Sequence, residues 1–264
     1  MTDSTKKSVP EFSSNNPDAT SSRAFSLNRN QLKYIAIFAM LLDHIAWILS
    51  QTYYDQPWNH ALTFVFRTIG RLTAPIMSWF LVQGYIHTSS KKRYALRLLI
   101  FALVSQIPFS LVRSGKLWSS ELNVIYTLLL SFLILCIIDS ELDRFPKILL
   151  VILLFALSAF GDWAIFMPFM VLIFYLLRDR RRALIIFYSI LSLLVVLADI
   201  VILCIRGYYW HWELWQAGMF LFIPLLLLYN GQPGSRHPFH KWIFYAFYPA
   251  HLLILWFILK ICNL

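Results

Sequence analysis

Charged residues are scarce in this chain of 264 residues. They make up 14% of the sequence, against about 25% in ordinary soluble domains, whereas hydrophobic residues reach 59%. So few charges could not cover the surface of a soluble protein of this length. The three cysteines are scattered through apolar stretches, which excludes a disulfide framework or a cysteine-based metal site. The composition is typical of a helical membrane protein, and the aromatic content of 17% suits one with many lipid–water interfaces.

Several motifs of soluble enzymes are also absent. The sequence has no glycine-rich phosphate loop, no HExxH zinc motif and no GxSxG nucleophile elbow. His237 and His240 lie close together but have no further ligands nearby, so we expect no metal. The net charge of +10 comes from short basic clusters between apolar runs, which is typical of cytoplasmic loops rather than of nucleic-acid binding.

The chain divides into a polar tail and an apolar remainder. Residues 1–28 predict a disordered cytoplasmic tail, and residues 29–264 a single transmembrane domain. The apolar segments are 34–53, 61–87, 94–112, 122–139, 147–160, 163–177, 183–205, 214–229 and 242–260. Because a span takes about 17–25 residues, 147–160 and 163–177 are short; they form either a tight hairpin or one broken element. We therefore expect an all-α, polytopic bundle of about nine spans, within a range of about eight to ten.

The basic clusters predict the orientation of these spans. With nine spans and a cytoplasmic N-terminus, the clusters in the tail and in loops 88–97, 178–182 and 230–241 all face the cytoplasm. Loop 113–121, with Arg113 and Lys116, falls on the other side and disagrees mildly. Tryptophans near the expected span ends predict an aromatic belt; they are Trp58, Trp118, Trp163, Trp210, Trp212, Trp215 and Trp242.

Asp43 and His44 lie deep in the first apolar segment. They follow Lys33 by about ten residues, which places them about 15 Å into a hydrocarbon core about 30 Å thick. An ionisable group at that depth costs at least about 2.5–3.5 kcal/mol, so both are candidates for function. Neighbouring residues point about 100° apart on a helix, so Asp43 need not be the group that orients His44. The alternative is a neutral histidine satisfied inside the bundle.

Arg67 and Arg71 share one face of the second segment because they are four residues apart. Guanidinium groups stay charged, so this pair requires an anion, either Asp43 or a bound ligand. Gly70 and Pro75 permit a helix break, and broken helices at membrane depth line cavities. Two interpretations remain open: a structural network with Asp43, or recognition of a phosphate or carboxylate.

Three further ionisable residues lie in apolar surroundings. Asp162 is either a turn residue or part of the site. Asp199 is interpreted as a polar contact in the seventh span. His251, in the last span, is more often a core histidine than a catalytic one when judged alone.

Blocks of sequence in a fixed order carry a resemblance. These blocks are MLLDH, FRTIGRLTAPIMSWFLVQGYIHT, RYALRLLIFALVSQIPF, LNVIYTLLLS, GDW and FYAFYPAHLLIL. Over about residues 30–260 the pattern resembles the TraX family of membrane proteins, named for the acetyltransferase that modifies the N-terminus of F-type conjugative pilin. Gln83 stands where an acidic residue is expected, so no carboxylate role is carried over to that position.

The TraX family is similar to multispan acyltransferases that move an acyl group from cytosolic acyl-CoA to an acceptor outside the membrane. The resemblance implies a catalytic His44, with Asp43 beside it, and arginines Arg67 and Arg71 that bind the coenzyme or stabilise the oxyanion. His251 and Asp162 are possible further site residues. The implied donor is acetyl-CoA without a metal, the acceptor an exported peptide or a glycan, and the location the bacterial inner membrane, in contact with lipid.

Two other functions fit the same residues. A transporter of a small anion or lipid would use the buried charges as a permeation site, although no internal repeat relates the two halves of the chain. The second of these functions is that of a structural subunit in a secretion or pilus assembly complex.

Overall fold

The computed structural model describes residues 26–261 except 54–55, 208–209, 236 and 238. The helices are α1 (Arg29–Thr52), α2 (Pro57–Gly70), α3 (Thr73–His87), α4 (Lys91–Ser114), α5 (Val124–Ile138), α6 (Arg144–Ser158), α7 (Phe166–Leu176), α8 (Arg181–Ile205), η2 (Trp210–Leu221), α9 (Phe222–Leu228) and α10 (Phe239–Ile261). No strand occurs among the described residues, which confirms the all-α prediction.

Four helices are long and apolar enough to cross a membrane. They are Arg29–Thr52, Lys91–Ser114, Arg181–Ile205 and Trp242–Ile261. Large apolar side chains such as Leu103, Phe145 and Ile205 are exposed on the outer faces of the bundle, where lipid rather than water would solvate them. The chain is therefore a helical membrane protein, whereas the count of about nine spans and the cytoplasmic N-terminus stay predictions.

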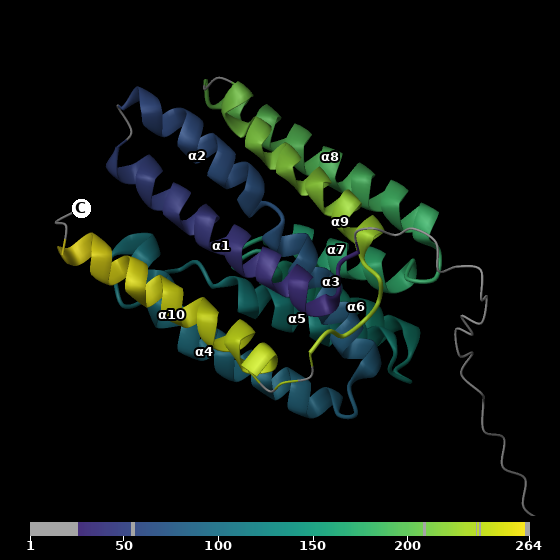
Figure 1. Cartoon of the computed structure of the whole chain (residues 1–264). Helices are drawn as coiled ribbons and strands as arrows, with labels where there is room; N and C mark the ends of the chain where they lie inside the picture. The colour runs from purple at the N-terminus through teal and green to yellow at the C-terminus, as the bar shows by residue number, and fades with distance from the viewer. Residues whose placement is uncertain (1–25, 54–55, 208–209, 236, 238, 262–264) are drawn as a thin grey trace, which may run out of the picture.

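Helix α1 lies at the centre of the bundle. It packs against α2, α3 and α10. Helix α2 in turn contacts η2, which lies against α8, and α10 contacts α4. Figure 1 shows α1, α2, α8 and α10 as roughly parallel rods, with α5 and α7 behind them. Side chains from the middle of α1 therefore meet three neighbouring helices.

The second apolar segment is broken, as its glycine and proline permit. Helix α2 ends at Gly70 and α3 begins at Thr73. Gly70 lies so close to α1 that an added Cβ would stand 2.5 Å from the Cβ of Asp43. A Cβ on Gly218 of η2 would likewise collide with the backbone carbonyl of Thr68. The glycines thus allow α2 to approach α1 on one side and η2 on the other.

The two short segments are separate helices joined by a turn. Helices α6 and α7 both pack against α5, and α7 also contacts α3. The turn is tied to the strand-like residue before α5, because Leu122 N donates to Phe160 O (2.8 Å) and Asp162 N donates to Leu122 O (2.7 Å). The segment 214–229 differs from the expected regular helix, since it begins as the 3₁₀ helix η2 and continues as α9.

Most of the expected tail, residues 1–25, lies outside the described residues. Residues 26–28 belong to the folded part: Leu27 is buried and forms a bridge with Tyr229. Asn28 caps α1 and forms a capping box with Gln31.

Asp139, directly after α5, joins the ends of several helices. Its carboxylate accepts hydrogen bonds from Tyr85 Oη (2.8 Å) and Tyr175 Oη (2.7 Å), and Lys91 Nζ lies 3.6 Å away. Burial opposes ionisation, but the hydrogen bonds from Tyr175 and Tyr85 and the charge of Lys91 bring the pKa of Asp139 below its ordinary value. Asp139 therefore stabilises the fold as a carboxylate.

We expect Asp139→Asn to lower the stability of the purified protein by about 1.5–3 kcal/mol at neutral pH, because it removes charge-assisted hydrogen bonds. A lowered folded-state pKa means that this stabilisation is present above the unfolded-state pKa and is lost as the pH falls through the folded-state pKa. The difference in melting temperature between wild type and variant should therefore shrink in acid. Asp143→Asn is the control, since Asp143 is exposed and its side chain makes no capping bond. Equal losses in the two variants would contradict the assignment.

Candidate functional site

An ion pair between α1 and the end of α2 forms the centre of the site. Arg71 Nη2 donates to Asp43 Oδ1 at 2.7 Å, and Arg67 Nη1 lies 3.5 Å from the same oxygen. Gly70 makes this approach possible because it has no side chain to displace Asp43. The structure thus brings together Asp43 and both arginines that the sequence singles out.

Two tryptophans cover these arginines. The guanidinium carbon of Arg71 lies 4.8 Å from the ring centroid of Trp163 and 4.6 Å from that of Trp215, and Arg67 lies 5.2 Å from Trp215. Such contacts hold a guanidinium plane against an aromatic face in a water-poor setting. The faces of Trp163 and Trp215 are therefore occupied by cations inside the bundle, and their place in an aromatic belt stays a prediction.

The remaining belt tryptophans differ. Trp58, Trp118 and Trp242 expose about half of their side chains or more, which suits a belt. The side chains of Trp210 and Trp212 lie outside the described residues.

A second polar chain reaches Arg71 from η2 and α8. Gln216 Nε2 donates to Asp199 Oδ2 at 2.6 Å, and Arg71 Nη1 lies 3.5 Å from Gln216 Oε1. Asp199 is thus a polar contact, as the sequence suggests, and Gln216 is its partner. Arg71 Nε is buried and has no hydrogen-bond partner among the described residues. Nε is therefore the guanidinium nitrogen of Arg71 that the structural contacts leave unused.

His44 of α1 pairs with His251 of α10. Nδ1 of His44 lies 2.8 Å from Met40 O and 3.3 Å from Nε2 of His251, while Nδ1 of His251 lies 2.7 Å from Phe247 O. Carbonyl oxygens only accept hydrogen bonds, so each neutral ring carries its proton on Nδ1. Nε2 of His251 then shares the Nδ1 proton of His44 with Met40 O, and Nε2 of His44 makes no hydrogen bond to a described residue.

The two neighbouring residues of α1 serve different partners. Asp43 faces Arg71 of the α2–α3 junction, whereas His44 faces His251 of α10. This agrees with the expectation that residues about 100° apart on a helix need not share a face. His251, which sequence alone favours as a core residue, contacts the ring of His44 at a centroid distance of 4.9 Å.

Asp162 approaches the same place from the turn before α7. Its Oδ1 accepts from Trp163 N at 3.0 Å, and Thr127 Oγ1 donates to its backbone carbonyl at 2.7 Å. Trp163 has a φ of +59°, a conformation that a bulky residue adopts only when its surroundings impose it. The turn therefore holds Trp163 in place over Arg71 against a local backbone preference.

A small cavity of about 30 Å³ lies between these groups. Asp43, His44, Arg71, Asp162 and Trp163 all line it. It has room for a water molecule or a small group, but not for a cofactor. Within the described residues, no cluster of three or more His, Cys, Asp or Glu is arranged to hold a metal ion.

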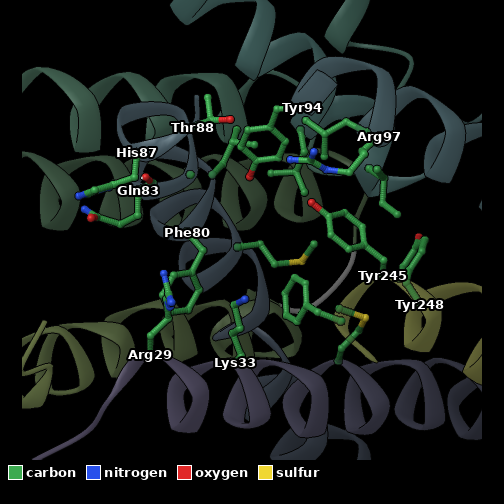
Figure 2. A pocket seen from close by; sticks show the side chains of 18 residues that line it. Arg29, Lys33, Phe80, Gln83, His87, Thr88, Tyr94, Arg97, Tyr245 and Tyr248 are labelled. Atoms are coloured by element: carbon green, nitrogen blue, oxygen red, sulfur yellow. The ribbon is translucent and has the colours of Figure 1, made fainter. Parts of the chain in front are cut away.

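A larger cavity of about 390 Å³ lies beyond Met40 and Tyr248, which line both cavities. Figure 2 shows Lys33 rising into it from α1 and Arg97 reaching it from the opposite side, with Phe80 and Tyr245 also lining the cavity. The sequence did not predict this cavity or its residues, because Lys33 and Arg97 stand at the ends of predicted loops, where a charge is ordinary. It also missed Gln216, for which no local sequence signal exists.

The comparisons with known proteins agree on one relationship. The family described as TraX protein matches residues 28–259. The probable fimbrial assembly protein FimC, serogroup H1, of Dichelobacter nodosus is 32% identical over 244 residues, which cover 89% of this chain and 96% of that protein. No solved structure matches the chain.

Proposed function

The chain belongs to the TraX family, and from this premise we propose that it is a membrane acetyltransferase. In this proposal it moves an acetyl group from acetyl-CoA to an amine or hydroxyl of an exported acceptor. The observation that carries the proposal is His44, whose Nε2 makes no hydrogen bond to a described residue while its Nδ1 is held by Met40 and His251. Acyl transfer needs such a group to take a proton from the acceptor.

The reaction follows from the groups around the small cavity. His44 Nε2 removes a proton from the acceptor amine or hydroxyl as that atom attacks the thioester carbonyl carbon. The bond between carbon and sulfur then breaks, and the departing thiolate takes the proton from His44. The products are the acetylated acceptor and free CoA thiol, and His44 returns to its starting form. His251 supports the transient imidazolium because its Nε2 accepts from His44 Nδ1.

The oxyanion formed in this reaction needs a donor, and Arg71 supplies one. Its Nε is buried without a partner and Arg71 lines the same cavity as His44. A donor already fixed in place by Asp43, Trp163 and Trp215 does not have to reorganise as the negative charge develops. Asp43 and Arg67 act by positioning Arg71 rather than by touching the reacting atoms.

The acceptor is inferred from the relatives. The resemblance described above implies pilin as the acceptor, and the Dichelobacter nodosus relative is named for fimbrial assembly. We therefore propose the N-terminal amine of an exported pilin-like peptide, in the inner membrane of a bacterium. A glycan hydroxyl is the alternative acceptor, because the same base and oxyanion donor serve both.

The test uses proteoliposomes of one orientation, with acetyl-CoA on the face that carries the basic loops and a pilin-like peptide on the other. We expect release of CoA thiol and acetylation of the peptide N-terminus, since the sequence predicts His44 at the depth where the two substrates could meet. A peptide with a blocked N-terminus is the control and should give no product. Product formed only when both substrates share one compartment would contradict transfer across the membrane, and no product in any arrangement would contradict the enzyme.

A further inference from the structure

The larger cavity has the chemistry of an anion site. Arg29, Lys33 and Arg97 all line it, and none of the described residues that line it is an Asp or Glu. Lys33 lies over the rings of Phe80 (5.8 Å) and Phe244 (5.6 Å) and forms no ion pair with a described carboxylate. Partly buried cations without a counter-ion are unfavourable, so this cavity favours a negatively charged occupant.

Arg97 adds an independent observation. Its guanidinium carbon lies 5.1 Å from the ring centroid of Tyr94, and its Nε is buried with no hydrogen-bond partner among the described residues. A buried donor without a partner is rare in folded proteins. In Figure 2 Arg97 and Lys33 extend from opposite walls of the cavity, so an anion inside it would meet positive charge from both sides.

The two arginines near His44 are less suited to binding a phosphate-bearing ligand. Arg67 and Arg71 already share the carboxylate of Asp43, and the cavity beside Arg71 is only about 30 Å³. A phosphorylated nucleotide would not fit there. The larger cavity has more than ten times that volume, at about 390 Å³, and two of the residues that line it, Arg29 and His87, are exposed.

We propose that this cavity binds the phosphate-bearing part of the CoA donor through Lys33 and Arg97, with the acyl arm passing between Met40 and Tyr248 to His44. This inference rests on the proposed function and assigns its donor site. Met40 and Tyr248 line both cavities, so only these two side chains need to part for the arm to reach His44. Phosphate oxygens are the natural partners of a guanidinium group, and the apolar lining suits an uncharged arm.

The test measures CoA binding to the full-length protein in nanodiscs made of zwitterionic lipid, without any acceptor. Lys33→Met and Arg97→Met should each raise the Kd for CoA by at least about tenfold, because each removes a charged partner of a phosphate. Binding of acetyl-pantetheine, which lacks the phosphates, should not change in either variant. Arg93→Met is the matched control, since Arg93 is exposed, lies on α4 one turn before Arg97 and lines neither cavity.

The outcomes separate this inference from the proposed function. An unchanged Kd for CoA in both variants, with acetyl transfer intact, would overturn the site and leave the enzyme standing. Weakened CoA binding in both variants supports the site even if no acceptor is ever acetylated. A third outcome is that CoA does not bind, but anionic phosphatidylglycerol in the nanodisc raises the stability of the wild-type protein and not that of the two variants. The occupant is then a lipid headgroup, and the donor site is wrong.

Discussion

His44→Ala should leave a folded, membrane-inserted protein whose acetyl transfer falls by about 10²–10⁴-fold, the range expected for the loss of a general base. The physical reason is that Nε2 of His44 makes no hydrogen bond to a described residue and is available as a base, whereas His251 is engaged through both ring nitrogens. The measurement is kcat from release of CoA thiol by the purified variant, with CoA affinity measured alongside. The affinity should stay close to that of wild type, because the phosphate-binding residues are untouched.

Ser50→Ala is the control for His44→Ala. Ser50 lies on the same helix, its Oγ donates to Trp47 O at 2.7 Å, and it lines neither cavity. It should turn over at the wild-type rate. Wild-type turnover by His44→Ala would mean that the histidine pair is a structural contact between α1 and α10, and the assignment of the base would be wrong.

Arg71→Lys should lower kcat by about 10²–10³-fold, the range seen when one oxyanion donor is lost. Lysine keeps a positive charge beside Asp43, so the fold is spared the penalty of an unpaired buried carboxylate. It lacks the planar fork and the Nε donor, so it cannot serve Asp43 and the oxyanion together. The measurement is kcat together with the melting temperature of the variant.

Arg67→Lys is the matched comparison for Arg71→Lys. Arg67 lies 3.5 Å from Asp43 and does not line the small cavity, so its replacement should lower kcat by less than about tenfold. If the two lysine variants lose activity equally, Arg71 has no special part in the chemistry and both arginines act only through Asp43. The comparison therefore separates the oxyanion donor from the structural network.

Parts of the site could be predicted from sequence because burying charge is expensive. Asp43, His44, Arg67 and Arg71 stand out in any apolar segment, and Gly70 marks the break that brings two of them to α1. Asp162 and His251 are weaker candidates from sequence, since a single polar residue near a turn or in a last span has several ordinary explanations. Their grouping around one cavity depends on helices that are far apart in the chain.

Other features had no sequence signal of their own. Trp163 and Trp215 near span ends look like belt residues, and only the packing of η2 and of the turn before α7 places their rings on the arginines. Lys33 and Arg97 look like loop-end charges, because hydropathy does not say whether a charged side chain points to water or into a cavity. Their direction into the cavity is fixed only when α1, α3, α4 and α10 pack together.

The amino-acid sequence by itself determined that this protein is helical and lies in a membrane, since the shortage of charge and the length of the apolar runs leave no other folded state for it. It also determined which buried charges must find partners, because an ionised side chain in an apolar segment demands one. Only the tertiary structure decided which partners they find. Asp43 goes to Arg71 and His44 to His251 because α1 lies between α2 and α10, and that arrangement depends on contacts between residues distant in sequence, such as Gly70 against Asp43, which no local pattern encodes.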